Sequence, residues 1–474
     1  MSRFLNLLWE RPARVVSASF VTAALLGAGL LSLPGATATP GSLPFLDALF
    51  TATSAVCVTG LIVVDTPTAF TPFGHAVILA LIQMGGLGIM AFAISTVFLV
   101  RRRLTMTEAE LLSFMLNEKN RHLVARQLRN VFAVALTIEA VGALLLTVAF
   151  LAHGQPADQA AWYGVFHAVS AFANAGFALF SDSLEQFVHA PLVNWVVMIL
   201  IMSGGIGFGS LLLFTGRARP VGHDHDYYAE MTYQPRIERM GKDSSLRHRV
   251  REPRALPVRV AVAGTAVLLG VGAVLFYLLE ARNSLVGMSI PEKYLTSLFQ
   301  SVTFRTAGFN TVSFQEVRRA TLLVALPLMF IGGASGGTAG GIKIGTVAVL
   351  MAEFRRFFFH QRDATLFQRR VPGRLVTQAV ILITAGLTTV MVATVVLSLT
   401  ETATLEVIVF EVVSALGTVG LSAGLTGDLS ETGRVVVIIL MLIGRLGPLT
   451  LFAAFRPEGK STALRLPEGD LPVG

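Results

Sequence analysis

Apolar runs long enough to cross a lipid bilayer recur along the whole chain, and they restrict its fold more than any other feature. Eight of them cover about 15–33, 76–100, 130–152, 192–215, 258–280, 320–350, 375–399 and 434–455. Roughly 20 apolar residues in a helix span the hydrocarbon core. Only 14% of the residues are charged, whereas soluble domains carry about a quarter. The sequence therefore predicts an all-α polytopic membrane protein. The first run is interpreted as a span rather than a signal peptide, because it is long and lacks a small-residue cleavage site.

A shorter apolar segment lies between the two spans of each successive pair. The four segments cover about 44–57, 160–173, 292–304 and 404–416, and each is too short to cross the membrane. Prolines or acidic residues, which favour helix N-termini, stand near their starts: Pro44, Asp47, Pro156, Asp158, Pro291, Glu292 and Glu406. The chain is thus predicted to repeat one unit four times, consisting of a span, a re-entrant helix and a second span.

Lysine and arginine are distributed unevenly over the connectors. The termini and the connectors after each second span hold 29 of the 37 basic residues, and the connectors with the short segments hold six. Positive charge collects on the cytoplasmic side of membrane proteins. Both termini are therefore expected in the cytoplasm and the re-entrant segments outside, although the third outer connector, with five basic residues, fits least well. The net charge of +8 accordingly reflects topology rather than nucleic-acid binding.

The four short segments end in similar phrases that share a glycine. Each phrase has a serine followed by alanine or valine and, several residues later, a glycine followed by leucine or phenylalanine. The phrases are Thr51–Leu61, Ser170–Phe177, Ser301–Phe309 and Ser414–Leu421. Their glycines, at 60, 176, 308 and 420, are 116, 132 and 112 residues apart. One such glycine alone is more often an ordinary helix cap. Four in register with the spans favour a repeated functional element.

The phrases have the features of a cation pathway built from backbone oxygens. The C-terminal end of a helix is partially negative, so four short helices directed at one axis would stabilise a cation there. Beyond the helix ends, carbonyl oxygens can replace the hydration shell of potassium, and glycine permits the positive φ that this requires. The predicted ion-binding residues are Val58, Thr59, Gly60, Asn174, Ala175, Gly176, Thr306, Ala307, Gly308, Thr418, Val419 and Gly420. The last three repeat the core of the potassium-filter motif T-V-G-Y-G.

The phrases S-A-F-A-N-A-G-F, T-F-R-T-A-G-F-N and S-A-L-G-T-V-G-L-S closely resemble the second, third and fourth filter segments of the Trk/Ktr/HKT family of potassium transporters. The resemblance covers about residues 12–456, and the eight spans are more like the shorter Ktr-type membrane subunit. It implies four M1–P-loop–M2 repeats, with eight transmembrane helices and four re-entrant pore helices around a central pore. It further implies a homodimer, a cytoplasmic ring of RCK-type nucleotide-binding regulatory subunits, and potassium preference where all four filter positions are glycine. A serine in the first filter is linked in that family to sodium permeation, and this chain has Gly60 there.

The sixth span is interrupted by a glycine-rich stretch, residues 331–341. Its glycines are Gly332, Gly333, Gly336, Gly337, Gly340 and Gly341. Each costs about 1 kcal/mol relative to alanine in a helix, and a helix broken within the membrane must face protein or water. We interpret the stretch as a loop across the pore beneath the filter that acts as a gate, which the family resemblance supports. A close-packed glycine face is the alternative. A phosphate-binding loop is not expected, because no Gly-Lys-Ser/Thr follows and no strand precedes it.

Two arginines fall at membrane depth. Arg445 lies in the middle of the last span, where a charge usually faces a water-filled cavity or a partner. We expect it to line the pore below Gly420 and restrain flow, as the matching arginine is thought to do in the family, rather than to snorkel to the interface. Arg305 lies inside the third filter phrase, and the sequence leaves open whether it repels cations or props the filter. The glycine motifs at 85–88 and 204–209 are interpreted as packing sites or bends.

The four repeats are assigned to residues 1–129, 130–257, 258–374 and 375–474. Repeats 1 and 2 end in cytoplasmic linkers, repeat 3 contains the glycine-rich gating loop, and repeat 4 ends in a short tail. In the linkers, 101–129 has an amphipathic helical pattern, and the His-Asp motif at 223–226 is more typical of a solvated loop than of a metal site. The single cysteine, Cys57, excludes an internal disulfide and a thiolate metal cluster.

The predicted function is potassium uptake across the inner membrane, with potassium held by the filter carbonyls, and without enzymatic activity or a cofactor in this chain. The alternative is a sodium-permeable or weakly selective cation channel or transporter of the same fold. A membrane-embedded enzyme lacks the clustered ionisable residues it would need, and a non-conducting scaffold would show no ion flux. The sequence leaves open whether sodium or protons are coupled to potassium uptake, with sodium as a candidate coupling or activating ion.

Overall fold

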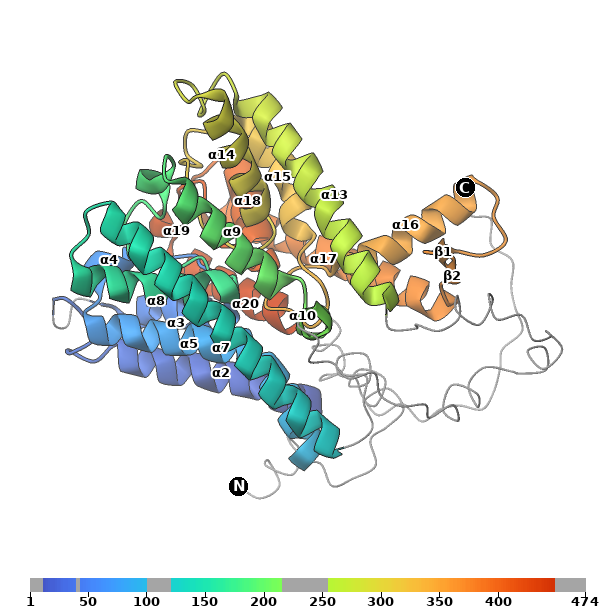
Figure 1. The fold of residues 1–474 in the computed structure, drawn as a ribbon, viewed down its shortest axis with the longest axis horizontal. Helices are drawn as coiled ribbons and strands as arrows, with labels where there is room; N and C mark the ends of the chain where they lie inside the picture. Colours follow the sequence, from blue (N-terminus) through green and yellow to red (C-terminus); the bar gives the residue numbers. More distant parts are fainter. Residues whose placement is uncertain (1–11, 40–42, 100–120, 215–254, 448–474) are drawn as a thin grey trace.

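The computed structural model describes residues 12–39, 43–99, 121–214 and 255–447, and the described chain is mostly helical (Figure 1). The terminal residues, most of the two predicted linkers with the expected amphipathic pattern and His-Asp motif, and the end of the eighth predicted span lie outside the described residues. The only strands in the described part form a small antiparallel hairpin, β1 (Thr365–Leu366) with β2 (Arg369–Arg370).

The first two repeats each contain a long helix, a short helix that ends inside the protein, and a returning helix. The helices of repeat 1 are α2 (Pro12–Leu31), α3 (Phe45–Cys57), α4 (Thr66–Ala69) and α5 (Pro72–Leu99). The helices of repeat 2 are α7 (Arg121–Ala152), α8 (Ala157–Ala173), η1 (Glu185–Phe187), α9 (Pro191–Gly205) and α10 (Phe208–Phe214). The short helices α3 and α8 coincide with the re-entrant segments that the sequence predicts.

The last two repeats follow the same order. The helices of repeat 3 are α13 (Ala255–Glu280), α14 (Ile290–Thr303), α15 (Arg319–Phe330) and α16 (Ile344–Phe358). The helices of repeat 4 are α17 (Gly373–Thr400), α18 (Leu405–Gly417), α19 (Leu425–Asp428) and α20 (Glu431–Leu446). The sixth predicted span is divided between α15 and α16, because the glycine-rich stretch between them forms no helix. In Figure 1, α16 and the β1–β2 hairpin extend away from the rest of the helices.

The first helix of each repeat is the one best suited to cross a membrane. Among the described residues, four helices are long and apolar enough to do so: Arg14–Leu31, Arg129–Ala152, Leu256–Glu280 and Gly373–Thr400. Each leaves large apolar side chains exposed, for example Leu26, Leu144, Leu278 and Leu399, at 66%, 65%, 68% and 83%. Exposed leucines on such helices are expected where lipid surrounds the protein. Several second helices of the repeats are shorter apolar helices, as for Pro191–Gly205 and Arg319–Phe330.

The repeats close into a ring through one recurring contact. The second long helix of each repeat packs against the short helix of the next: α5 on α8, α9 on α14, α15 on α18, and α20 back on α3. Buried side chains fill the joints, so that one core cluster joins Leu81 of repeat 1 with Phe166 of repeat 2 and Met441 of repeat 4. The four short helices are therefore surrounded by the long ones, which gives the fold of an all-α polytopic membrane protein with four pore-loop repeats.

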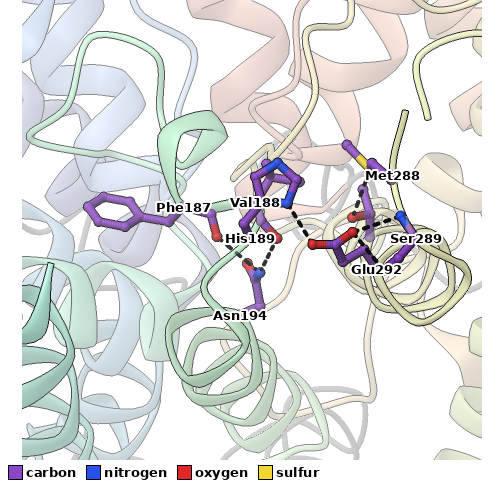
Figure 2. A network of polar contacts seen from close by, with 8 residues as sticks. Phe187, Val188, His189, Asn194, Met288, Ser289 and Glu292 are labelled. Carbon is purple, nitrogen blue, oxygen red and sulfur yellow. Dashed lines mark hydrogen bonds and ion pairs between the residues drawn. The ribbon is translucent and has the colours of Figure 1, made fainter. Parts of the chain in front are cut away.

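Acidic residues at the starts of three short helices also bind the preceding repeat. Asp47 of α3 pairs with Arg434 of α20, and Glu406 of α18 pairs with Arg319 of α15 at 3.2 Å. Figure 2 shows the third case, in which His189 lies 2.8 Å from Glu292 of α14. Prediction from sequence assigned these acids only to helix N-termini. The structure adds that they link neighbouring repeats at the start of the re-entrant helices.

Glu292 is fixed in place by a capping box. Its carboxylate accepts hydrogen bonds from both the backbone N–H and the hydroxyl of Ser289, each at 2.7 Å (Figure 2). These two contacts, and then His189, hold the pKa of Glu292 at about 2, below its usual value of 4.5. On the other side of the joint, the amide of Asn194 donates to the carbonyl oxygens of Phe187 and Val188, at 3.1 and 3.0 Å. The backbone that carries His189 and the backbone that carries Glu292 are therefore both braced by further hydrogen bonds.

Candidate ion-conduction site

The four filter glycines lie side by side around one axis. A Cβ atom built on Gly60 would come closer than 3.0 Å to the carbonyl oxygen of Ala175, in the next repeat. The same close approach follows from Gly176 to Ala307, from Gly308 to Val419, and from Gly420 back to Thr59. The four glycines and the four carbonyls before them therefore form a closed ring. Only glycine fits there, because any side chain would meet the backbone of the neighbouring repeat.

The backbone takes the same unusual course in all four segments. The residue two before each filter glycine is left-handed, with φ of 56° at Val58, 61° at Asn174, 66° at Thr306 and 50° at Thr418. The glycine two residues later is left-handed as well, with φ between 69° and 93°. The residue between them has negative φ in every segment. Such repetition in four segments of different sequence indicates a shared requirement on the backbone. Residues other than glycine adopt positive φ rarely and at a cost, which is often found at functional sites.

The short helices bring partial negative charge to this ring. Three of them end immediately before the left-handed residue, at Cys57, Ala173 and Gly417, and α14 ends at Thr303. Their C-terminal carbonyls thus lie next to the ring, where the helix dipole favours a cation and disfavours an anion. The carbonyl oxygens of the ring could replace water around a dehydrated cation, as carbonyls do in potassium filters. Such an arrangement can bind and pass cations without any ionised side chain.

A hydroxyl near the end of each short helix braces the filter from behind. Ser54 accepts from the N–H of Gly60 at 3.0 Å, and Ser414 accepts from the N–H of Gly420 at 3.1 Å. Ser170 donates to the carbonyl of Phe177 at 2.8 Å, and Thr303 donates to the carbonyl of Phe309 at 2.5 Å. All four are buried. The serines at 54, 170 and 414 are part of the repeated phrases, but the sequence pattern does not indicate this bracing role.

Repeat 3 departs from the alignment of the phrases. The sequence matched Ser301 with the serines of the other phrases, yet Ser301 donates to Leu269 of α13, at 2.8 Å, and Thr303 takes the position behind the filter. The reason lies in the helix end. In repeats 1, 2 and 4 the backbone N–H of the second filter residue donates to the carbonyl five residues back, as from Thr59 to Ser54. In repeat 3 it donates to the carbonyl four residues back, from Ala307 to Thr303. The segment of repeat 3 is therefore one residue shorter between hydroxyl and glycine.

The glycine-rich stretch lies against the filter segments of repeats 2, 3 and 4. The N–H of Gly340 donates to the hydroxyl of Thr306 at 3.1 Å, and Thr338 donates to the carbonyl oxygen of Phe172 at 3.1 Å. A Cβ on Gly340 would also collide with the side chain of Thr418. The stretch is an ordered loop, closed at its base by the N–H of Gly332 bonding to the carbonyl of Ile342 at 2.9 Å. Its middle is bonded to α9 through Ala334 and Gly205 at 3.0 Å.

Arg445 is buried against this loop. Its guanidinium donates to the carbonyl oxygen of Thr338 and, at 2.6 Å, to that of Gly85 in α5. Arg445 therefore joins the last helix of repeat 4 to the loop of repeat 3 and to repeat 1. The side chain is 7% exposed, so it does not extend to a membrane interface.

Two further basic side chains contact the same loop. Lys343, at its end, donates to the carbonyls of Ala339 and Gly340, at 2.6 and 3.3 Å. Arg305, in the third filter segment, donates to the carbonyl of Gly332 at 3.4 Å. Arg305 also lines a cavity of about 20 Å³ together with Asn174 and Gly333. Although Arg305 belongs to the third filter phrase, its guanidinium is thus directed at the glycine-rich loop.

The remaining glycine motifs serve packing and one bend. A Cβ on Gly85, Gly204 or Gly444 would collide with a carbonyl near the end of the adjacent short helix, at Val56, Phe172 or Leu416. These glycines let the second helices of three repeats approach the filter closely. Gly207, with φ of 90°, lies in the break between α9 and α10. The interpretation of these motifs as packing sites or bends is confirmed for Gly85, Gly204 and Gly207.

Four inward-directed helices around a closed backbone ring define a pore-loop membrane protein for cations. The family described as TrkH, cation transport protein, matches residues 15–218 and 254–464. The chain belongs to this family, whose members are cation transporters rather than enzymes.

Relatives in the same family match over nearly the full chain. The chain is 35% identical over 475 residues to Ktr system potassium uptake protein B of Bacillus subtilis, with 98% of each chain covered. It is 34% identical to the protein of the same name from Vibrio alginolyticus, with 97% of this chain and 94% of the relative covered. It is 35% identical to the potassium/sodium uptake protein NtpJ of Enterococcus hirae, with 93% and 92% covered.

The fold itself matches a solved structure, that of the potassium transporter TrkH from Vibrio parahaemolyticus. The TM-score is 0.69 at 20% identity, with 94% of this chain and 84% of the other covered. The expected fold and the expected family are both confirmed.

Proposed function

We propose that the protein takes up potassium across the cytoplasmic membrane, with the ion passing through the ring of Gly60, Gly176, Gly308 and Gly420. The single observation that carries the proposal is the closed contact of each glycine with the carbonyl of the next repeat. The names of the relatives from Bacillus subtilis and Vibrio alginolyticus, both potassium uptake proteins, support the choice of ion. Glycine at all four positions is consistent with that choice.

The proposed path continues past the glycine-rich loop, which acts as the gate. Its contacts with Thr306 and with Phe172 support this role, because a loop bonded to the filter segments stands in the way of an ion that leaves them. Arg445 adds a fixed positive charge to the closed loop through its bond to Thr338. A cation that leaves the filter meets this charge, so the closed loop together with Arg445 restrains flow.

In this proposal the protein works as a multi-pass inner-membrane subunit with both termini in the cytoplasm. The basic termini and linkers support that orientation. We further propose that it functions as a homodimer, regulated by a cytoplasmic ring of RCK-type nucleotide-binding subunits, as the family resemblance implies. In the described part of the chain, α16 and the β1–β2 hairpin extend away from the other helices and are the candidate contact with such a partner (Figure 1).

A second candidate is a transporter of the same fold that passes sodium as well as potassium. One observation favours it, which is the name of the Enterococcus hirae relative, a potassium/sodium uptake protein at 35% identity. The two candidates differ only in selectivity, and they share the site and the path.

Cation-resolved flux tests the proposal. The purified chain is reconstituted into liposomes, and uptake of potassium, rubidium, sodium and lithium is measured side by side. Potassium and rubidium passing well ahead of sodium supports potassium uptake. Equal passage of sodium supports the second candidate. If no cation passes even in a variant whose loop is shortened by deleting Gly336 and Gly337, the pore itself is contradicted. Gly345→Ala is the matched control for the loop, because a Cβ there meets no atom within 4 Å.

A further inference from the structure

Each short helix carries, at one shared position, a buried polar residue that the pathway described so far does not use. It stands three residues before the hydroxyl that braces the filter, and therefore about one helical turn farther from the helix end. The four residues are Thr51, His167, Gln300 and Glu411. Thr51 is 1% exposed and the other three are fully buried. Four different residue types at one structural position are not expected for simple packing, since buried polar groups are costly unless they are hydrogen-bonded.

Three of these residues bind the chain just after the filter glycine. His167 accepts from the N–H of Leu179 at 3.3 Å, three residues after Gly176. Gln300 donates to the hydroxyl of Thr311 at 3.1 Å, again three residues after the glycine. Two contacts therefore hold each of these filter segments. The serine or threonine hydroxyl binds at or next to the glycine, and His167 or Gln300 binds the residue three positions after it.

Glu411 makes the strongest of these contacts. Its carboxylate accepts from the hydroxyls of Ser422, at 2.7 Å, and of Thr426. The hydroxyl of Ser422 in turn accepts from the N–H of Gly424 at 3.1 Å. Glu411 therefore organises the whole turn that follows Gly420, through hydrogen bonds that are strong because they are buried and involve an acidic group.

We propose that Glu411, with His167 and Gln300, positions the chain segments that follow the filter glycines and thereby sets the preference for potassium over sodium. Sodium is the smaller ion, so the same carbonyls must move inward to bind it equally well. A filter segment that is anchored by hydrogen bonds to its short helix resists that movement. Glu411 is thus a positioning residue, which acts through Ser422 and Thr426 and does not touch the ion. This inference rests on the proposed function, since it assigns a determinant of selectivity within it.

Repeat 1 provides the internal comparison. Among the described residues, the hydroxyl of Thr51 has no hydrogen-bond partner. The segment that follows Gly60 in repeat 1 is therefore not held by Thr51. Thr51→Val introduces a side chain of the same shape and removes no hydrogen bond. It is the matched control for the other three.

The test is the ratio of potassium to sodium flux in liposomes for the full chain. Glu411→Ala is expected to lower this ratio about tenfold, because the hydroxyls of Ser422 and Thr426 lose their buried acceptor. Glu411→Gln keeps a group of the same shape that bonds to both hydroxyls, so the ratio is expected to return to within about twofold of wild type. Thr51→Val is expected to leave the ratio unchanged.

Three outcomes bear against the inference. A Glu411→Ala ratio equal to that of wild type overturns it, and so does an equal loss of potassium and sodium flux, which a merely structural role would produce. If Glu411→Ala does not fold, Ser422→Ala and Thr426→Val remove the hydroxyls from the other side, and an unchanged ratio in both overturns it.

A wild-type protein without preference for potassium overturns the proposed function itself. A selective wild type with a selective Glu411→Ala variant overturns only this inference.

Discussion

Arg434 and Asp47 form an ion pair although they are 387 residues apart in the chain. The pair joins the start of α20 to the start of α3, and so closes the ring between the last repeat and the first. Asp47 is only 7% exposed, and Arg434 also donates to the carbonyl of Leu429 at 3.0 Å. Among the described residues, this is the most buried of the three side-chain contacts between an acidic residue at the start of a short helix and the neighbouring repeat.

The ring closure should therefore depend strongly on Arg434. Arg434→Met leaves the carboxylate of Asp47 buried and unpaired, and we expect a loss of about 3 kcal/mol in the free energy of unfolding. Arg319→Met is the control, because its pair with Glu406 is solvent-exposed and is worth less than about 1 kcal/mol. Chemical unfolding in detergent micelles measures both. Equal losses in the two variants would show that burial of Asp47 does not decide the strength of this joint.

Glu292 predicts a pH dependence at the second joint. Its pKa is about 2 in the folded protein and 4.5 ordinarily, so folding favours its charged form. The stabilisation is complete above about pH 4.5 and is lost as the pH falls toward 2. Thermal unfolding of the wild type should thus move to lower temperature between pH 5 and pH 3, and that of Glu292→Gln should move less.

Variants of Ser289 and His189 distinguish the two causes of the lowered pKa of Glu292. The hydrogen bonds from Ser289 are the larger cause and the histidine is the smaller. Ser289→Ala should therefore reduce the pH dependence more than His189→Ala does. The reverse order would assign the effect to the link between repeats instead of the capping box.

Gly60 should be sensitive to the smallest side chain. Gly60→Ser adds a Cβ that meets the carbonyl oxygen of Ala175, at a residue with φ of 93°. The ring must shift at that carbonyl, so we expect the potassium-to-sodium flux ratio to fall about tenfold or more. Gly29→Ala is the control, since a Cβ there meets no atom within 4 Å, and its flux should match wild type. A Gly60→Ser protein with wild-type selectivity would contradict the account of the filter.

Arg445 should restrain flow. Arg445→Ala removes the fixed charge and frees the carbonyls of Thr338 and Gly85, and we expect potassium flux to rise severalfold with selectivity retained. Arg445→Lys keeps the charge but not the two-pronged contact, so its flux should lie between those of wild type and Arg445→Ala. Flux of Arg445→Ala equal to that of wild type would remove the barrier role.

Local patterns in the sequence were sufficient to find the repeats. Apolar runs and short segments follow from hydrophobicity alone, and the four glycines follow from their register with the spans. The same patterns identified the acids at 47, 292 and 406 as helix starts, because such acids interact with their own helix. None of this required knowledge of how one repeat meets another.

The features that the sequence did not provide depend on contacts between segments that meet only in the folded chain, or on how one helix ends. The pairing of Arg434 with Asp47 joins residues from opposite ends of the chain. Thr303, instead of Ser301, braces the third filter, because α14 ends differently by one residue. The direction of Arg305 was open because only the packed loop offers it the carbonyl of Gly332. A signal for the bracing hydroxyls existed in the serines before each glycine, but their role follows only from the folded filter.

The central claim is that the four glycine segments form one cation-binding ring. Anomalous diffraction from crystals grown in rubidium, which resembles potassium in size and charge, tests it most directly. The account predicts a rubidium peak on the axis, within coordination distance of the carbonyl oxygens of Thr59, Ala175, Ala307 and Val419, and its loss in Gly60→Ser crystals. Rubidium bound only elsewhere, with no peak inside the ring of a well-ordered wild-type crystal, would contradict it.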